Sequence, residues 1–385
     1  MFFTPPILLI AKNNMFDFYA IMRITNIQPY TNTQKTSKQN KVSHFGQYVS
    51  RLGRSIDDVL RVNEPSSKSL SALYDELLNF VRSPKFLSKQ NGEGHFSHVY
   101  NIDDKYVLKV PKHCCAEPDK NIELRDPLFP QLKTYYGDTL LISGDLKILK
   151  NVSSDNKHTV VGVPAKIIKE NPMPNPRVDG CLRYGMVFAD YQYGNEILKY
   201  YNEVYLPTFS ALPQSSFDKI AKDLALLNKK GFDNYGFSID TNNPNNIVLV
   251  GKSSLRIVDD INVVNKRKPN SIAGLLNMFL VRASHNIVLP LPTNDSSKIL
   301  RFQLLKKIIL AGEKYDLPLT CYNVQDKNIW YHSCYGLDGF GLKVLDNIQK
   351  MRDNIPDKKQ RFVEVEKYIN MLGEKLERST NQQGI

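Results

Sequence analysis

The chain has 385 residues, of which 42% are hydrophobic and 23% are charged, and its formal net charge at pH 7 is +12. This length fits one large two-lobed domain or two ordinary ones, and the charged fraction is that of a chain that folds. The positive charge suits an acidic partner, which could be nucleotide phosphates, an anionic membrane, nucleic acid or an acidic protein, and the charge alone does not distinguish these. No apolar run is long enough to cross a bilayer, and the irregularly spaced cysteines argue against a zinc site and a disulfide framework.

Residues 1–50 differ in composition from the rest of the chain. About half of residues 24–50 are Ser, Thr, Asn or Gln, and residues 18–56 contain no acidic side chain. Such a segment buries too little apolar surface to offset its loss of conformational entropy. We therefore expect residues 1–50 to be a disordered polar leader, and the more specific alternative is an export or secretion signal. Met22 is a second plausible start of the chain.

Residues 51–90 are expected to form a helical extension. Apolar side chains recur there at three- and four-residue steps, which is typical of an amphipathic helix. Ser66 and Ser67 precede the stripe and are candidate helix caps. The residues of the stripe are Leu70, Leu73, Leu77 and Val81.

The two remaining parts differ in pattern, and together they predict an α+β fold with segregated layers. Residues 91–193 contain short alternating or β-branched runs, which predict strands. Residues 194–385 contain two short strands at 246–250 and 255–258, and otherwise helical periodicity. The helices expected in this part are 215–230, 270–283, 297–312, 342–353 and 358–376.

A glycine-rich segment at the start of the strand-rich part is the first candidate site. Gly92 and Gly94 flank one residue, and Ser97 and Val99 follow at fixed steps. Glycine lets the backbone approach phosphate oxygens without a clash from a Cβ atom. A hairpin then returns the chain to Lys109, at the end of a strand that would run beneath the loop.

This segment resembles the Gly-rich loop and the β3 lysine of protein kinases and of the related aminoglycoside-phosphotransferase-like kinases. The resemblance implies a two-lobed kinase-like fold, with a small strand-rich N-lobe at 91–193 and a helical C-lobe. It also implies that Lys109 contacts the α- and β-phosphates of ATP. Residues 116–133 occupy the place of the helix that carries the lysine's carboxylate partner. Glu123 is the best candidate for that partner.

Two carboxylates and an asparagine follow in the order that the kinase family uses. Asp240 resembles the catalytic aspartate, and an asparagine before the next strand would bind Mg²⁺. The family spacing favours Asn245 for this role, whereas the position before the strand favours Asn246, which we prefer. Asp233 is a rival catalytic acid, because four residues are inserted before Asp240 relative to typical kinases.

Asp259 is the last candidate residue. It follows a short apolar strand and resembles the Mg²⁺-binding aspartate of the Asp-Phe-Gly segment. Three departures from the kinase pattern accompany it. Ser238 and Ile239 stand where kinases carry His-Arg, Asp260 replaces the Phe of the Asp-Phe-Gly segment, and an Ala-Pro-Glu triplet is missing.

The resemblance implies an enzyme that transfers phosphate from ATP with Mg²⁺. The leader and the compact first lobe resemble secreted bacterial effector kinases, which implies a Ser/Thr protein kinase acting on a host protein in the host cytoplasm; otherwise a cytoplasmic location is expected. We expect no nucleic-acid partner. The alternatives are a small-molecule kinase of the aminoglycoside type and a catalytically inactive pseudokinase that binds a host protein.

Overall fold

A computed structural model describes most of the chain from residue 44 onward. The described residues are 44–62, 65–93, 97–111, 132–136, 139–142, 146–151, 158–161, 199–233, 237–241, 243–258, 261–262, 269–284, 287–288, 294–319 and 339–382. Gly94, Glu123 and Asp259 lie outside these ranges, as does the leader up to residue 43.

Two helices open the described chain. Helix α1 (His44–Leu60) begins inside the expected leader, so the boundary at residue 50 was placed too late. Its apolar residues are spaced for a helix even though the segment is rich in polar residues. Helix α2 (Ser67–Arg82) confirms the predicted stripe, and Ser66 is its N-cap, since the Ser66 side chain accepts a hydrogen bond from Ser69 N at 3.2 Å.

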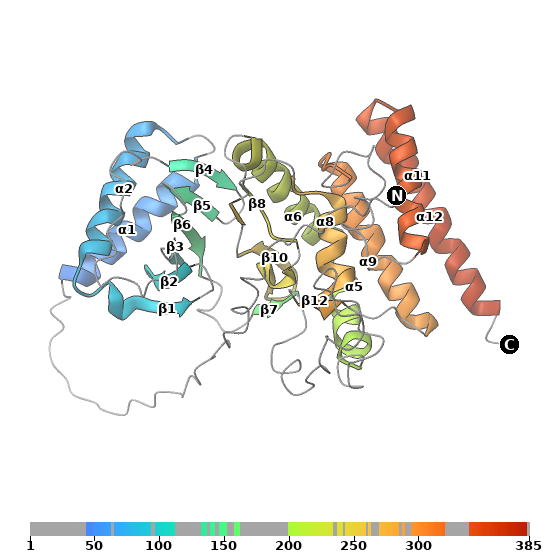
Figure 1. Cartoon of the computed structure of the whole chain (residues 1–385), viewed down its shortest axis with the longest axis horizontal. Helices are drawn as coiled ribbons and strands as arrows, with labels where there is room; N and C mark the ends of the chain where they lie inside the picture. The colour runs from blue at the N-terminus through green and yellow to red at the C-terminus, as the bar shows by residue number, and fades with distance from the viewer. Residues whose placement is uncertain are drawn as a thin grey trace, which may run out of the picture. The chain divides into compact units, whose positions relative to one another are not determined.

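A six-stranded antiparallel sheet follows, with the strand order β1-β2-β3-β6-β5-β4 (Figure 1). A short 3₁₀ turn, η1 (Leu87–Lys89), leads into it. Leu132 and Lys133, at the end of the segment 116–133 in which we expected a short or irregular helix, begin strand β4. The strands are β1 (Gln90–Glu93), β2 (Ser97–Asn101), β3 (Tyr106–Pro111), β4 (Leu132–Tyr136), β5 (Thr139–Ile142) and β6 (Leu146–Lys150).

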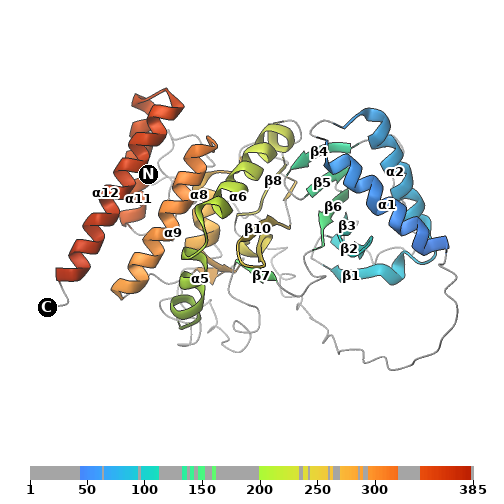
Figure 2. The same ribbon diagram turned by 180° about the vertical axis from the view of Figure 1, so that it is seen from behind.

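One face of this sheet packs on α1 and α2. Tyr100, Leu108, Ile148 and Leu140 lie directly opposite one another on four neighbouring strands, so their side chains share a face. All four are buried in one core with residues of both helices. Figures 1 and 2 show the two helices side by side along the sheet. The opposite face therefore carries the alternate residues of each strand.

A second, three-stranded sheet has the order β10-β9-β7. Strand β9 (Ile247–Val250) and strand β10 (Ser254–Ile257) confirm the predicted hairpin. Strand β7 (His158–Val160) pairs with β9, although residues 91–193 were expected to belong to the first lobe. The sequence shows that β7 is a strand but does not show its partner, because pairing depends on contacts far along the chain.

Helices and short elements complete the second core, which buries residues of β9, β10 and most of the helices. The predicted helices are confirmed, except that residues 282–284 form a strand. The elements are η5 (Tyr201–Tyr205), α5 (Leu206–Ser210), α6 (Gln214–Leu227), η6 (Asn228–Phe232), β8 (Phe237–Ser238), η7 (Pro244–Asn246), β11 (Ile261–Asn262), α8 (Ile272–Leu276), η8 (Asn277–Val281), β12 (Arg282–Ser284), β13 (Ile287–Val288), α9 (Asp295–Lys314), α11 (Gly339–Asn354) and α12 (Lys358–Gln382).

The fold is α+β, as the order of strands and helices predicts. Its strand-rich part comes first and its last described elements are helices. Among the helices that the structure describes, none combines the length and the apolarity needed to cross a bilayer.

Candidate active site

Asp240 lies in a tight loop between β8 and the 3₁₀ turn η7. The Asn243 side chain caps η7 by accepting a hydrogen bond from Asn245 N at 3.2 Å. One more residue separates Asp240 from β9 than in the kinase spacing to which the sequence was compared. The turn leads directly into Ile247 at the start of β9. Asp240 itself is half-buried, so its carboxylate can meet both protein and solvent.

Of the two asparagines before β9, Asn246 is the one whose side chain binds the loop around Asp240. The Asn246 side chain is only 4% exposed, whereas Asn245 is exposed. Asn246 Nδ2 donates to the backbone oxygen of Asp240 at 3.1 Å, and its Oδ1 accepts from Asn243 Nδ2 at 3.1 Å. Its backbone oxygen accepts from Val258 N at 3.0 Å, which brings the residue preceding Asp259 in the sequence beside Asn246.

Asn270 holds the other side of the loop. Its Oδ1 accepts a hydrogen bond from Ile239 N at 2.9 Å, and Asn270 is 1% exposed. Asn270 is in turn fixed by Asn228. Asn228 Oδ1 accepts from both the backbone and the side-chain amide of Asn270, at 2.8 and 2.9 Å, and Asn228 Nδ2 donates to Asn270 O at 2.9 Å.

Asn277 holds the residue after Asp240. Its Nδ2 donates to the backbone oxygen of Thr241 at 2.6 Å, and the side chain is 7% exposed. Helix α8 comes close to the same residue, because a Cβ atom built on Gly274 would lie 2.7 Å from Thr241 Cγ2. Glycine is therefore required at this position for the helix to approach the loop.

Three asparagine side chains thus bind the backbone of three consecutive residues, 239–241, with Asp240 in the middle. Two of the asparagines in this network, Asn228 and Asn277, begin the π-helical segments η6 and η8, a geometry that often occurs at functional sites. We did not predict Asn228, Asn270 or Asn277. A signal for Asn277 existed, because a lone amide within an apolar helical run has to find a buried partner.

Lys109 lies on the six-stranded sheet, on the face opposite α1 and α2. The register places Gly92 opposite Val99, and Val99 opposite Lys109, so these three residues form one row across β1, β2 and β3. Val107, two residues before Lys109, shares this face. Ser97 shares it as well, at the start of β2, and is half-buried.

A second lysine, which we did not predict, accompanies Lys109. Lys147 on β6 is directly opposite Lys109 and is 5% exposed. Like charges opposite each other on a sheet are unfavourable, so such a pair is best accommodated where negative charge meets it. Both lysines have polar or electrostatic interactions within the protein.

The predicted residues therefore fall into two groups. Asp240 and Asn246 lie together in the loop that precedes β9, and Gly92, Val99 and Lys109 lie together on the six-stranded sheet. The rival Asp233 is exposed at the end of η6, outside the asparagine network.

Metal ligands of the usual kind do not cluster in the part of the chain that the structure describes. Within it, no three side chains of His, Cys, Asp or Glu come together as a metal site. Comparison with protein-family models, with curated proteins and with solved structures gives no significant match. The two groups of residues and their geometry are therefore the observations on which a proposal for the function can rest.

Proposed function

We propose that the chain is an ATP- and Mg²⁺-dependent phosphotransferase with a two-lobed kinase-like fold, acting on a Ser or Thr of a protein. The observation that carries this proposal is the fixed loop around Asp240. Its backbone is held on three sides by buried amides, while the Asp240 carboxylate stays half-buried. A catalytic carboxylate needs this combination of a rigid backbone and access to a substrate.

Asp240 would orient the acceptor hydroxyl and take its proton as the oxygen attacks the γ-phosphorus of ATP, while the bond from that phosphorus to the bridging oxygen breaks and ADP leaves. Asn246 contributes to this by binding the Asp240 backbone oxygen, which sets the direction in which the side chain leaves the loop. Asp233 is less suited to the role, because it is exposed at a helix end.

The sheet face with Lys109 would bind the nucleotide. Val99 and Val107 supply apolar surface on that face, and Lys109 supplies a positive charge for the phosphates. Lys147 adds a second positive charge opposite Lys109. We propose that the ligand of this face bears phosphate, because the positive charge of Lys109 would attract a polyanion more strongly than a neutral ligand.

The described loop is compatible with Mg²⁺, which prefers oxygen ligands. Among the described residues, the Oδ1 atom of Asn246 accepts a hydrogen bond from Asn243, and an amide oxygen has two lone pairs, so we propose the second for the metal. We propose that Asn246 and Asp259 hold Mg²⁺, and that Asn245, which is exposed, does not. When bound, the ion would neutralise charge on the phosphates.

The acceptor is proposed to be a host protein, with the chain acting as a secreted bacterial effector. The polar composition of residues 24–50 supports secretion. The net charge of +12 favours an acidic protein surface over a cationic aminoglycoside as substrate.

A catalytically inactive scaffold is the second candidate, and one observation favours it. Asn243 Nδ2 already occupies one lone pair of Asn246 Oδ1, so a metal would have to share this oxygen. A scaffold of this kind would bind nucleotide weakly or not at all and would transfer no phosphate.

Transfer of labelled terminal phosphate from Mg·ATP to a generic Ser/Thr substrate, beside calorimetric titration with Mg·ATP, tests the proposal. We expect Asp240→Asn to lower turnover about 100-fold or more with nucleotide affinity preserved, because orienting the hydroxyl and binding ATP are separate tasks. Lys109→Met should weaken both binding and turnover.

Two further variants serve as matched comparisons. Lys105→Met removes an exposed lysine from the same hairpin as Lys109 and should leave turnover unchanged. Asp233→Asn should also leave it unchanged if Asp240 is the acid. Nucleotide binding without any phosphate transfer in the wild type would favour the scaffold, and equal turnover in wild type and Asp240→Asn would refute the assigned acid.

A further inference from the structure

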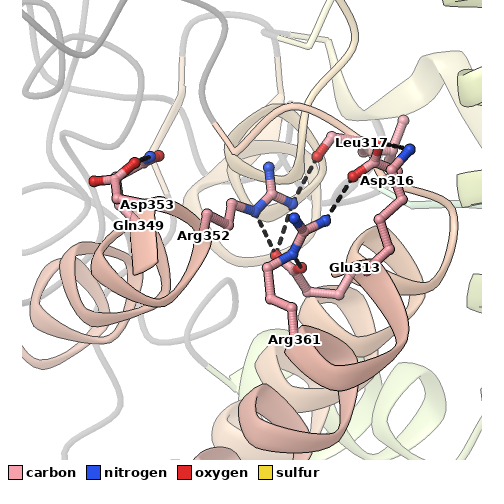
Figure 3. Close-up of polar contacts among 8 residues, drawn as sticks. Glu313, Asp316, Leu317, Gln349, Arg352, Asp353 and Arg361 are labelled. Atoms are coloured by element: carbon pink, nitrogen blue, oxygen red, sulfur yellow. Dashed lines mark hydrogen bonds and ion pairs between the residues drawn. The ribbon is translucent and has the colours of Figure 1, made fainter. Parts of the chain in front are cut away.

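The buried carboxylate of Glu313 on α9 joins the last two helices to the second core (Figure 3). Its side chain is fully buried. Arg352 of α11 binds Glu313 Oε1 through Nη2 at 2.6 Å and Nε at 2.8 Å, and Arg361 of α12 approaches Oε2 at 3.3 Å. Burying three charges costs desolvation energy, so such a network is better explained by the geometry it fixes than by stability.

The two arginines also hold the turn that follows α9. Arg352 Nη2 donates to Leu317 O at 2.8 Å, and Arg361 Nη2 binds Asp316 Oδ1 at 2.7 Å. Asp316 has a φ of 53°, a left-handed conformation that ends the helix. Since non-glycine residues avoid this conformation, the contacts of Arg361 with Asp316 and of Arg352 with Leu317 help to keep it there.

This turn leads directly to the start of α8. The backbone oxygens of Pro318 and Leu319 accept hydrogen bonds from Ile272 N and Ala273 N, each at 2.9 Å. These amides belong to the first turn of α8, which has no partner for them within the helix. Ser271 Oγ accepts from Gly274 N at 3.0 Å and completes the cap.

Helices α8 and α9 also touch at this end. A Cβ atom built on Gly312 would lie 2.3 Å from Ile272 Cγ1. The start of α8 is thus fixed by two contacts, the packing against α9 and the hydrogen bonds to residues 318–319. The asparagines that hold the loop around Asp240 stand on either side of α8, at Asn270 and Asn277.

We infer that Arg352 and Arg361 are positioning residues for the loop that carries Asp240. They set the turn after α9, the turn sets the start of α8, and the asparagines flanking α8 set the loop. Neither arginine belongs to the proposed site, so each would act through other residues. The catalytic part of this inference rests on the proposed function, whereas the chain of contacts does not.

Amide hydrogen exchange on the full chain, beside steady-state phosphate transfer, tests the inference. In Arg352→Met we expect exchange at Ile239, Ile272 and Ala273 to speed up about tenfold, because the contacts that hold these amides loosen. Turnover should fall about tenfold or more while the KM for ATP stays within about twofold, because a misplaced loop affects chemistry rather than nucleotide binding. Amides in the middle of α6 should be unaffected.

Lys350→Met is the matched control on α11, because its ion pair with Asp346 is exposed. It should change neither exchange nor turnover. Asp316→Asn is a milder second variant, since asparagine tolerates the left-handed backbone. It should speed amide exchange and lower turnover as Arg352→Met does, but by smaller factors. If Arg352→Met does not fold, Asp316→Asn decides whether the inference holds.

Unchanged exchange in both Arg352→Met and Asp316→Asn would overturn the inference, as would faster exchange with unchanged turnover. If the wild type transfers no phosphate, the proposed function fails. In that case the exchange rates alone decide whether the arginines hold the loop.

Discussion

Asparagine carries both a carbonyl oxygen and an amide nitrogen, and the loop around Asp240 depends on both. Asn270 accepts from a backbone N–H, and Asn246 and Asn277 donate to backbone oxygens. A carboxylate could not donate and a hydroxyl is too short to span the same gap. The backbone of Asn270 orients the side-chain amide of Asn228, whose Oδ1 in turn accepts from Asn270 Nδ2.

Asn270→Ala tests how much this network contributes to stability. The substitution leaves the buried N–H of Ile239 without its acceptor, so the free energy of unfolding should fall by about 1–3 kcal/mol. Denaturant unfolding monitored by circular dichroism measures it. Asn245→Ala, at an exposed position, should change the free energy of unfolding by less than about 0.5 kcal/mol. Equal midpoints for the two variants would contradict the network.

The sequence predicted the residue types of the loop better than their partners. It pointed to Asp240 as a candidate catalytic acid. It left Asn245 and Asn246 as alternative Mg²⁺ ligands, because the kinase spacing favours Asn245 and the position directly before the strand favours Asn246. The structure exposes the first and buries the second. The sequence does not indicate Asn228 or Asn270, because their mutual contact joins positions far apart in the chain.

At the scale of elements, α1 is attached to the sheet through polar as well as apolar contacts. Asp57 Oδ1 accepts from the Tyr106 hydroxyl at 2.5 Å, and Oδ2 pairs with Lys105 Nζ at 2.9 Å. Between the two helices, the Tyr48 hydroxyl of α1 donates to the backbone oxygen of Glu76 in α2, and burial raises the pKa of Tyr48 to about 12. Tyr48 therefore remains a donor throughout the neutral range.

Asp57 makes part of the stability depend on pH. The hydrogen bond from Tyr106 is the main reason that the pKa of Asp57 lies below its usual range; the contact with Lys105 lowers it further, and partial burial acts in the opposite direction. The unfolded chain therefore binds the proton more readily. The stabilisation is present above the unfolded pKa and is lost as the pH falls through the folded pKa.

We expect Asp57→Asn to be less stable than the wild type at pH 7 and to lose less stability than the wild type on acidification below about pH 5. Urea unfolding at several pH values measures this. Asp58→Asn on the same helix is the control, since Asp58 has only an exposed pairing with Arg61 at 3.9 Å. Parallel pH profiles for wild type and Asp57→Asn would show that the contact contributes nothing.

Elements were predicted well where the signal is local. The periodicity of α2, α6, α9, α11 and α12 lies within each helix, and the turn residues at 251–253 lie between the two strands that they join. The assignment of β7 to the first lobe and the end of the leader at residue 50 were wrong, because β7 pairs with β9 and α1 begins at His44. Both depend on packing against segments elsewhere in the chain.

At the scale of the whole molecule, two separate cores account for the α+β class. One gathers α1, α2 and a face of the six-stranded sheet, and the other gathers β9, β10 and the later helices. Composition and element order were sufficient to predict this class, because strands and helices are segregated along the chain. A nucleotide site that joins the two parts remains a proposal.

Thermal unfolding with ligand tests that proposal without a substrate. At a free Mg·ATP concentration about 100 times the dissociation constant, binding should add about 2.7 kcal/mol to the free energy of unfolding and raise Tm. Excess EDTA should remove most of the shift if Mg²⁺ is bound with the nucleotide. Lys109→Met should show little shift, and Lys105→Met should behave as the wild type. An unchanged Tm in the wild type would argue against a nucleotide site.

The pairing of β7 with β9 has a consequence for synthesis on the ribosome. The six-stranded sheet and its two helices come from residues made early, so this core can form while translation continues. Strand β7 is made next, but its partner at Ile247–Val250 emerges much later. Until then β7 presents unpaired backbone groups, which are prone to intermolecular pairing. Slow translation between the two strands would therefore prolong the period in which the nascent chain is most prone to aggregate.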